Sequence, residues 1–155
     1  MGCVEYFVGL DLSISETGLV ILDNETEIQW FLIKSKTDSI IEDRFDFILD
    51  KIKFVKGIVG LKSVYMENLS FASRGNAIFQ LAGLHFIVRH FFFKNNVPYK
   101  LIAPQTLKKF VTGNGRSTKD IIIKEIYKKW NVDINNNNLA DAYALARMAF
   151  EDSKK

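Results

Sequence analysis

The chain has 155 residues and a mass of 17.8 kDa, and 48% of its residues are hydrophobic while 25% are charged. This composition is typical of a globular domain and excludes a chain that is disordered throughout. No apolar run approaches the ~18 residues that span a bilayer, and the N-terminus lacks the pattern of a secretory signal. We therefore expect a single domain over residues 1–155 that has no membrane partner.

Cysteine and histidine are too scarce for most metal chemistry. The one cysteine, Cys3, excludes an internal disulfide and a cysteine-based zinc site. His85 and His90 lie in a segment with a helical pattern, and we expect them on the helix surface or at an interface. The sequence predicts an intracellular protein in a reducing compartment. If this protein binds a metal, carboxylates must hold it.

The net charge of +3 is unevenly distributed along the chain. Residues 1–70 carry 12 acidic and 7 basic side chains, a balance of −5, whereas residues 94–130 carry nine basic and two acidic side chains, a balance of +7. A basic surface favours an anionic partner because binding a phosphate backbone releases counterions. A solvated helix face explains a lysine cluster equally well, so charge alone does not decide the function.

The first third of the chain predicts three strands and a helix. The strands are expected at 4–10, 18–22 and 28–33, where apolar and β-forming residues concentrate. The polar turn at 23–25 joins the second strand to the third, which favours an antiparallel arrangement. Apolar residues then recur every three or four positions over 40–55 and predict an amphipathic helix.

The rest of the chain predicts two strands that helices connect. A short strand over 64–66 ends at Glu67, a helix covers 76–93, and a further strand covers 97–102. Three helices are expected after it: one from Pro104 to Val111, one capped by Ser117 or Thr118 that ends at Trp130, and one over 139–150. This order predicts an α/β fold with a five-stranded mixed sheet flanked by helices.

Three acidic residues stand at positions that suit a metal site. Asp11 ends the first predicted strand and Glu67 the fourth, and Asp141 lies in a helix dominated by alanine and leucine. Neighbouring strand ends would place the first two side by side. Carboxylates that converge repel each other unless a cation binds between them, and oxygen ligands suit Mg²⁺ or Mn²⁺. Two such ions ~3.5–4 Å apart can catalyse phosphodiester hydrolysis.

Each acid also has a purely structural interpretation. A strand-terminal aspartate such as Asp11 is often a turn or capping residue. Glu67 can open a loop, and Asp141 can pair with a lysine. The spacing of the three residues leaves both interpretations open.

Four short motifs follow one another between about residue 5 and residue 149. They are VGLDLS at 8–13 with TGL at 17–19, YMEN at 65–68, the segment 104–119 that contains TGNG, and NLADA at 138–142 with ALA at 144–146. Through these motifs the chain resembles the RuvC family of Holliday-junction resolvases. Members of that family are RNase H-like, dimeric, Mg²⁺-dependent endonucleases.

The resemblance implies a metal-dependent endonuclease that cuts four-way junctions and other branched DNA as a homodimer in the cytoplasm of a bacterial or phage-infected cell. Two Mg²⁺ ions per active site are implied, with Mn²⁺ as a substitute. Asp11 would bridge both ions, while Glu67 and Asp141 would bind one each. Lys119 would act in catalysis beside these three acids. No sequence feature identifies a motor protein as a partner.

Asn138 departs from the family pattern, which has an acid or a histidine three residues before the final aspartate. An amide offers a carbonyl oxygen to a hard cation but brings no charge. Asn138 is thus expected as a weaker, neutral ligand. A branched-DNA-binding protein with weak or no cleavage remains an alternative, as does another RNase H-like nuclease that acts on forks or on RNA–DNA hybrids.

A further group of residues is expected to bind DNA. The group is Phe71, Arg74, Lys108, Lys109, Gly113, Gly115, Arg116 and Lys119. The family places an aromatic residue near Phe71 at the junction crossover, although a loop anchor is an equal explanation, and Arg74 beside it can hold a phosphate. Gly113 and Gly115 permit a close approach of the backbone to a phosphate, although such a pair is often a simple turn.

Helix 76–93 carries more apolar surface than one buried face requires, including three consecutive phenylalanines at 91–93. Such an excess suits a dimer interface, and the family dimerises through this region.

Overall fold

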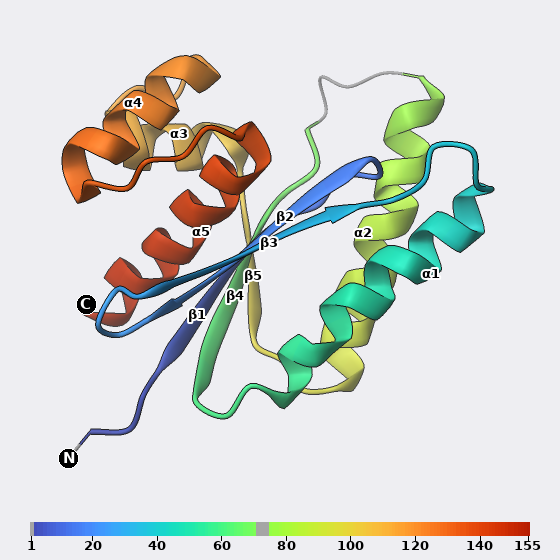
Figure 1. Ribbon diagram of the computed structural model, residues 1–155, viewed down its shortest axis with the longest axis horizontal. Coiled ribbons are helices and arrows are strands. Elements are labelled where there is room, and N and C mark those ends of the chain that lie inside the picture. Colours follow the sequence, from blue (N-terminus) through green and yellow to red (C-terminus); the bar gives the residue numbers. More distant parts are fainter. Residues whose placement is uncertain (1, 71–74) are drawn as a thin grey trace.

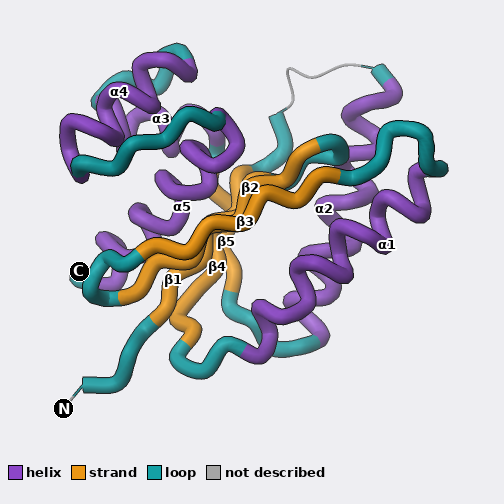
Figure 2. The backbone as a smooth tube through the Cα atoms, viewed as in Figure 1, coloured by secondary structure: helices purple, strands orange, loops and turns teal. Residues whose placement is uncertain are grey.

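Two groups of helices cover the two faces of a central sheet (Figure 1). The computed structural model describes residues 2–70 and 75–155. Helices α1 (Ile41–Ile52) and α2 (Asn76–Lys94) lie on one face. Helices α3 (Pro104–Thr112), α4 (Lys119–Trp130) and α5 (Asn137–Ser153) lie on the other. Figure 2 shows the strands as one twisted layer between the two groups.

The sheet has the mixed topology that the sequence predicts. Its strands are β1 (Tyr6–Asp11), β2 (Glu16–Asp23), β3 (Ile28–Lys34), β4 (Leu61–Glu67) and β5 (Tyr99–Ile102). Their spatial order is β3-β2-β1-β4-β5, with β2 antiparallel to both β1 and β3, and with β4 parallel to both β1 and β5. The predicted fold class is confirmed, and β1 is the central strand.

Side chains of the central strands alternate between two hydrophobic cores. On β1, Phe7 packs with α5, whereas Val8 and Leu10 pack with α1 and α2. On β4, Tyr65 packs on the α5 side and Met66 on the α2 side. Since successive side chains of a strand point to opposite faces, the last residues of β1 and β4 both fall on the face that α5 covers.

Helix α5 lies unusually close to β1 and β2 because glycines face it. A methyl group at Gly9 would overlap the carbonyl oxygen of Ala142, and one at Gly18 would overlap the carbonyl oxygen of Asn138. The first turn of the helix is fixed as well, because the side chain of Asn136 accepts a hydrogen bond of 2.9 Å from the Leu139 N–H. The helix is therefore held against the sheet at a set height.

The sequence misplaces several element ends. Strand β4 begins at Leu61 rather than at 64, since its first three residues, two of them polar, are not buried and give no strong apolar signal. The helix expected over 40–55 ends at Ile52 and continues as a 3₁₀ turn, η1 (Lys53–Gly57). Helix α5 begins at Asn137, inside the asparagine run, because Asn136 caps it.

The expected side-chain cap of α4 is wrong. Thr118 occupies the N-cap position without a side-chain hydrogen bond to the helix. The Ser117 hydroxyl turns to the preceding helix end instead, where it lies 2.6 Å from Thr112 Oγ1 and donates to the Asn114 carbonyl oxygen at 2.9 Å. These bonds stabilise the turn between α3 and α4.

Helix α2 buries one face and leaves large apolar side chains exposed on the other. Phe79, Phe86 and Phe93 are 75%, 58% and 72% exposed. The expectation that His85 lies at the surface is wrong, since it is 3% exposed and belongs to the buried face. Burial and the nearby charge of Arg89 lower the pKa of His85 to about 4. None of the described helices has both the length and the apolar character that a membrane crossing requires.

The contact between α5 and β1 gives a test of the packing. Gly9→Ala is expected to lower the free energy of unfolding by about 2–4 kcal/mol, because the new methyl group must displace helix backbone. Gly57→Ala is the matched control, since nothing lies within 4 Å of its added methyl group. Urea denaturation measures both. Equal stability of the two variants would show that α5 can move away freely.

Candidate active site

Three acidic side chains from separate elements meet at one edge of the sheet. Asp11 ends β1, and Glu67 ends β4 one position beyond the Leu10–Met66 pair of the parallel ladder. Asp141 projects from the second turn of α5. Each offers a carboxylate oxygen, and the three atoms lie within 4.8 Å of one another. The structure thus brings together the acids that the sequence singles out.

The cluster is electrostatically strained. Burial raises the pKa of Asp11 well above its ordinary value, and the charges of Asp141 and Glu67 raise it further, while Lys119 opposes the shift. Burial, with the charge of Asp141, raises the pKa of Glu67 to about 7. Burial also raises the pKa of Asp141, against the opposing charges of Lys119 and Lys108. A bound cation would relieve this repulsion.

A cavity of about 170 Å³ opens over the acids. Lys108 of α3, Lys119 of α4 and Asn138 of α5 line it together with the three carboxylates. The Lys119 ammonium lies 3.8 Å from Asp141 Oδ2, and its side chain is 57% exposed. This pair agrees with the simpler interpretation of Asp141 as a lysine partner, but it leaves the other two acids without a comparable contact in the described chain.

The donors in this cavity suit a divalent cation of the magnesium type. Three carboxylates and one side-chain amide provide hard oxygen ligands, and no histidine or cysteine lines the cavity. The raised pKa values show that burial, together with the neighbouring acids for Asp11 and Glu67, disfavours the charged carboxylates when the site is metal-free. Asp11, Glu67, Asp141 and Asn138 are therefore the residues that fit a metal.

The remaining predicted DNA-binding residues lie outside the cavity or outside the described chain. Lys109 and Arg116 are exposed and do not line it, although they lie close in sequence to Lys108 and Lys119, which do. Gly113 has φ of 81° and ends α3, which accounts for this glycine as a turn residue. Phe71 and Arg74 lie outside the described residues, and their roles remain predictions.

Gly115 has a packing reason of its own. A methyl group there would lie 3.2 Å from the carbonyl oxygen of Gln105, so the turn runs close to the start of α3. The Asn114 side chain accepts a hydrogen bond of 3.0 Å from the Arg116 N–H within the same turn. The segment is a well-defined turn, and its contact with phosphate remains a prediction.

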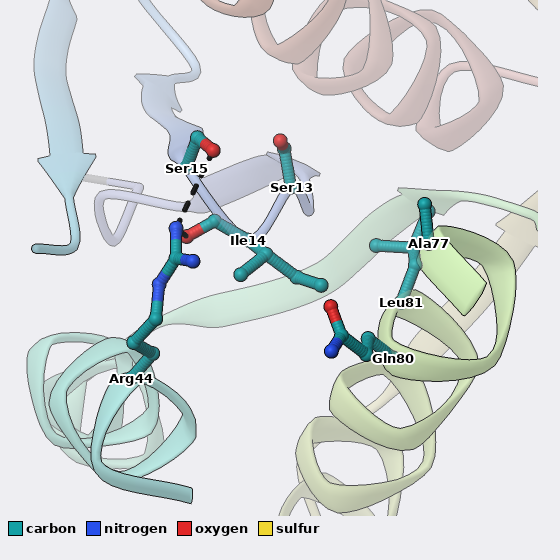
Figure 3. Close-up of a pocket in the computed structure, with 7 residues that line it drawn as sticks. All are labelled: Ser13, Ile14, Ser15, Arg44, Ala77, Gln80 and Leu81. Atoms are coloured by element: carbon teal, nitrogen blue, oxygen red, sulfur yellow. Dashed lines mark hydrogen bonds between the residues drawn. The ribbon is translucent and has the colours of Figure 1, made fainter. Parts of the chain in front are cut away.

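Sequence reasoning missed Arg44 of α1. Its guanidinium donates to the Ile14 carbonyl oxygen and to Ser15 Oγ, in the loop that follows Asp11 and β1 (Figure 3). The available signal was a charged residue on the apolar stripe of the predicted helix, three positions after Ile41 and four before Ile48. This arginine connects α1 to the loop beside the acids.

No protein-family model matches the chain, and no curated protein sequence matches it. Among solved structures, Thermus thermophilus RuvC has a TM-score of 0.77 at 18% identity, covering 98% of this chain and 96% of that one. T. thermophilus RuvC in complex with a Holliday junction substrate has a TM-score of 0.77 at 18% identity, covering 94% and 91%. The chain thus has an RNase H-like α/β fold. Within that class, the fold is RuvC-like.

Burial of the acids, together with the repulsion between them, should make the metal-free protein less stable as the pH rises. Folding raises the pKa of Glu67 from 4.5 to about 7, so the stability that its proton provides is complete below pH 4.5 and is lost as the pH rises through 7. Asp11→Asn removes one charge from the cluster and should increase the free energy of unfolding by about 1–3 kcal/mol at pH 8, with a smaller gain at pH 5.

Urea denaturation in EDTA at both pH values measures this effect, with exposed Asp133→Asn as the matched control. Added Mg²⁺ should stabilise the wild type more than Asp11→Asn, because a ligand stabilises the state that binds it. A gain that is the same at pH 5 and pH 8 would contradict charge repulsion as its cause.

Proposed function

We propose that this protein is a divalent-metal-dependent endonuclease that resolves Holliday junctions by phosphodiester hydrolysis. The observation that carries the proposal is the convergence of Asp11, Glu67 and Asp141 within 4.8 Å, beside two lysines. The RuvC-like fold supports it, since one structural neighbour is described as bound to a Holliday junction substrate. Other branched DNA belongs to the same proposed substrate class.

The acids hold the metal in this proposal. Asp11, on the central strand, lies within 4.8 Å of both other acids and would be shared between two Mg²⁺ or Mn²⁺ ions, with Glu67 and Asp141 each holding one. Asn138 would add a neutral oxygen. The bound cations would supply Lewis acidity that activates water and stabilises the leaving oxygen.

The lysines hold the phosphate. Lys108 and Lys119 line the same cavity as the acids, and their charges suit the scissile phosphodiester. The half-exposed Lys119 can exchange its long contact with Asp141 for a phosphate oxygen, because a 3.8 Å ion pair in solvent contributes little. Lys109 and Arg116 are exposed beyond the cavity, where flanking phosphates would pass.

Asn138 favours a second candidate function. Because this cavity residue is neutral, the described chain has three carboxylates in the cluster. A protein that binds branched DNA and cuts it slowly or not at all would have the same geometry. Labelled four-way junctions incubated with and without Mg²⁺ or Mn²⁺ distinguish the two, and competing forks and RNA–DNA hybrids test the substrate class.

Asp11→Asn is expected to lower the rate of junction cleavage at least 100-fold, whereas the affinity for the junction should stay within about twofold of the wild type. The carboxylate that both ions would share loses its charge, whereas the lysines that contact phosphate are unchanged. Paired nicks on a labelled junction in Mg²⁺ measure cleavage, and gel shift in EDTA measures binding. Asp133→Asn, at an exposed position outside the cavity, should cleave like the wild type. Cleavage by Asp11→Asn at the wild-type rate would remove the acid from the mechanism.

The exposed face of α2 supports a homodimer within the same proposal. Phe79, Phe86 and Phe93 recur every seven residues, so these exposed rings lie along one face of α2. Joining two copies through it would cover these rings. A two-fold axis would also arrange two acidic cavities symmetrically, which suits paired cuts in a symmetrical four-way junction.

Phe86→Glu is expected to convert a wild-type dimer into a monomer, because it places a charge at the centre of the apolar face. Light scattering after size-exclusion chromatography measures the mass. Val59→Glu is the matched control, since Val59 is 90% exposed on a loop before β4. A wild-type mass of 17.8 kDa at micromolar concentration would contradict the dimer.

A further inference from the structure

A second cavity, of about 280 Å³, lies where the β1–β2 loop meets α1 and α2 (Figure 3). Ser13, Ser15, Arg44 and Gln80 supply its polar groups, and Ile14 and Leu81 form its apolar wall. We call it the Arg44 pocket. The active site described above uses none of these side chains.

Arg44 carries an uncompensated positive charge in this pocket. Its Nε donates to Ser35 Oγ at 2.9 Å, and one terminal nitrogen donates to the Ile14 carbonyl oxygen at 3.3 Å and to Ser15 Oγ at 3.4 Å. All three acceptors are neutral. No carboxylate in residues 2–70 or 75–155 forms an ion pair with this half-buried guanidinium.

The guanidinium has donor capacity left. It has five N–H groups, and the bonds described above come from Nε and one of its two terminal nitrogens. In Figure 3 the other terminal nitrogen points away from Ser15 toward the space between Ile14 and Gln80. The Ser15 hydroxyl and the amide of exposed Gln80 add further donors around that space, and Ser13 lines its rim. A single group of fixed positive charge with neutral donors around it matches an anion with several oxygens.

The Arg44 pocket lies on the opposite face of the sheet from Lys108 and Lys119. Ser13 follows Asp11 by two residues, so the pocket begins where β1 ends. Arg44 and Gln80 come from α1 and α2, on one face of the sheet, whereas Lys108 and Lys119 come from α3 and α4, on the other. The acidic cluster at the end of β1 shares the face of the two lysines, and the Arg44 pocket lies on the other face beyond the same strand end.

We propose that the Arg44 pocket binds a backbone phosphate of the DNA, on the opposite face of the sheet from Lys108 and Lys119. The inference rests on the proposed function and adds a second anchoring point for its substrate. Arg44 would bind two phosphate oxygens, and Ser15 and Gln80 would donate to the rest. Anchors on both faces of the sheet would fix the scissile bond over the acids. Arg44 is here a positioning residue, since it contacts neither the acids nor the reacting atoms.

The test uses gel shift or anisotropy with a labelled four-way junction in EDTA, over a series of salt concentrations. Gln80→Glu places a carboxylate across the pocket from Arg44 and removes no side-chain hydrogen bond of the described residues, and it should weaken binding by about tenfold. Gln29→Glu, the same change on exposed β3 at the end far from the pocket, is the matched control and should bind like the wild type. Arg44→Gln should also lower the slope of log affinity against log salt by about one, since one phosphate contact is lost.

Thermal melting accompanies each variant because Arg44 also ties the β1–β2 loop to α1. Arg44→Lys keeps the charge and should restore the salt slope even where it lowers the melting temperature. If Gln80→Glu and Arg44→Gln both bind the junction with the affinity and the salt slope of the wild type, the inference is overturned while the proposed function stands. Failure of the wild type to bind any branched DNA would overturn both.

A separate arm distinguishes DNA phosphate from free phosphate. Inorganic phosphate is added in place of chloride at constant ionic strength. A pocket specific for the DNA backbone should give the same junction affinity in both salts. The wild type could instead bind the junction more weakly in phosphate than in chloride, with no such difference in Gln80→Glu. That result would show a site for the free anion and overturn the assignment to DNA.

Discussion

Mutual repulsion between three clustered carboxylates, two of them buried and one half-buried, is the constraint on which this structure depends. Asp11, Glu67 and Asp141 approach to within 4.8 Å in a site that raises the pKa of each. Their proximity is unfavourable in isolation, so the surrounding packing must impose it. Two parallel strands, β1 and β4, supply two of the acids at one sheet edge, and a helix held against β1 supplies the third. The apolar contacts of this fold therefore hold its polar site together.

The sequence predicts the sheet and the acids well because both follow local rules. Apolar segments of the right length mark the strands, and a carboxylate that ends a buried strand must lie at the sheet edge. The position of His85 was not predictable in this way. Helix α2 is apolar around most of its circumference, so periodicity does not say which face the sheet covers. Only the packing of α2 against β1 and β4 decides that His85 is inside and Phe86 outside.

The same limit explains why Arg44 escaped notice. Its role depends on the β1–β2 loop, 29 and 30 positions earlier in the chain, and no local pattern connects the two. The side-chain cap of α4 is a related case, since Ser117 has a choice between its own helix and the preceding turn, and it binds the turn. Interactions between segments distant in sequence decide such choices, whereas propensity describes each segment alone.

The main-chain contact at Gly9 and Gly18 has a consequence for how far the sequence can diverge. Because no side chain separates α5 from β1 at Gly9 or from β2 at Gly18, the height of the helix at these two points depends on the thickness of the polypeptide backbone, which substitution elsewhere cannot alter. Large residues in either core can be exchanged for others of similar volume while this spacing stays constant. A chain of this design can replace more than four-fifths of its residues and still superpose on a distant RuvC structure along nearly its whole length, as the 18% identity here illustrates.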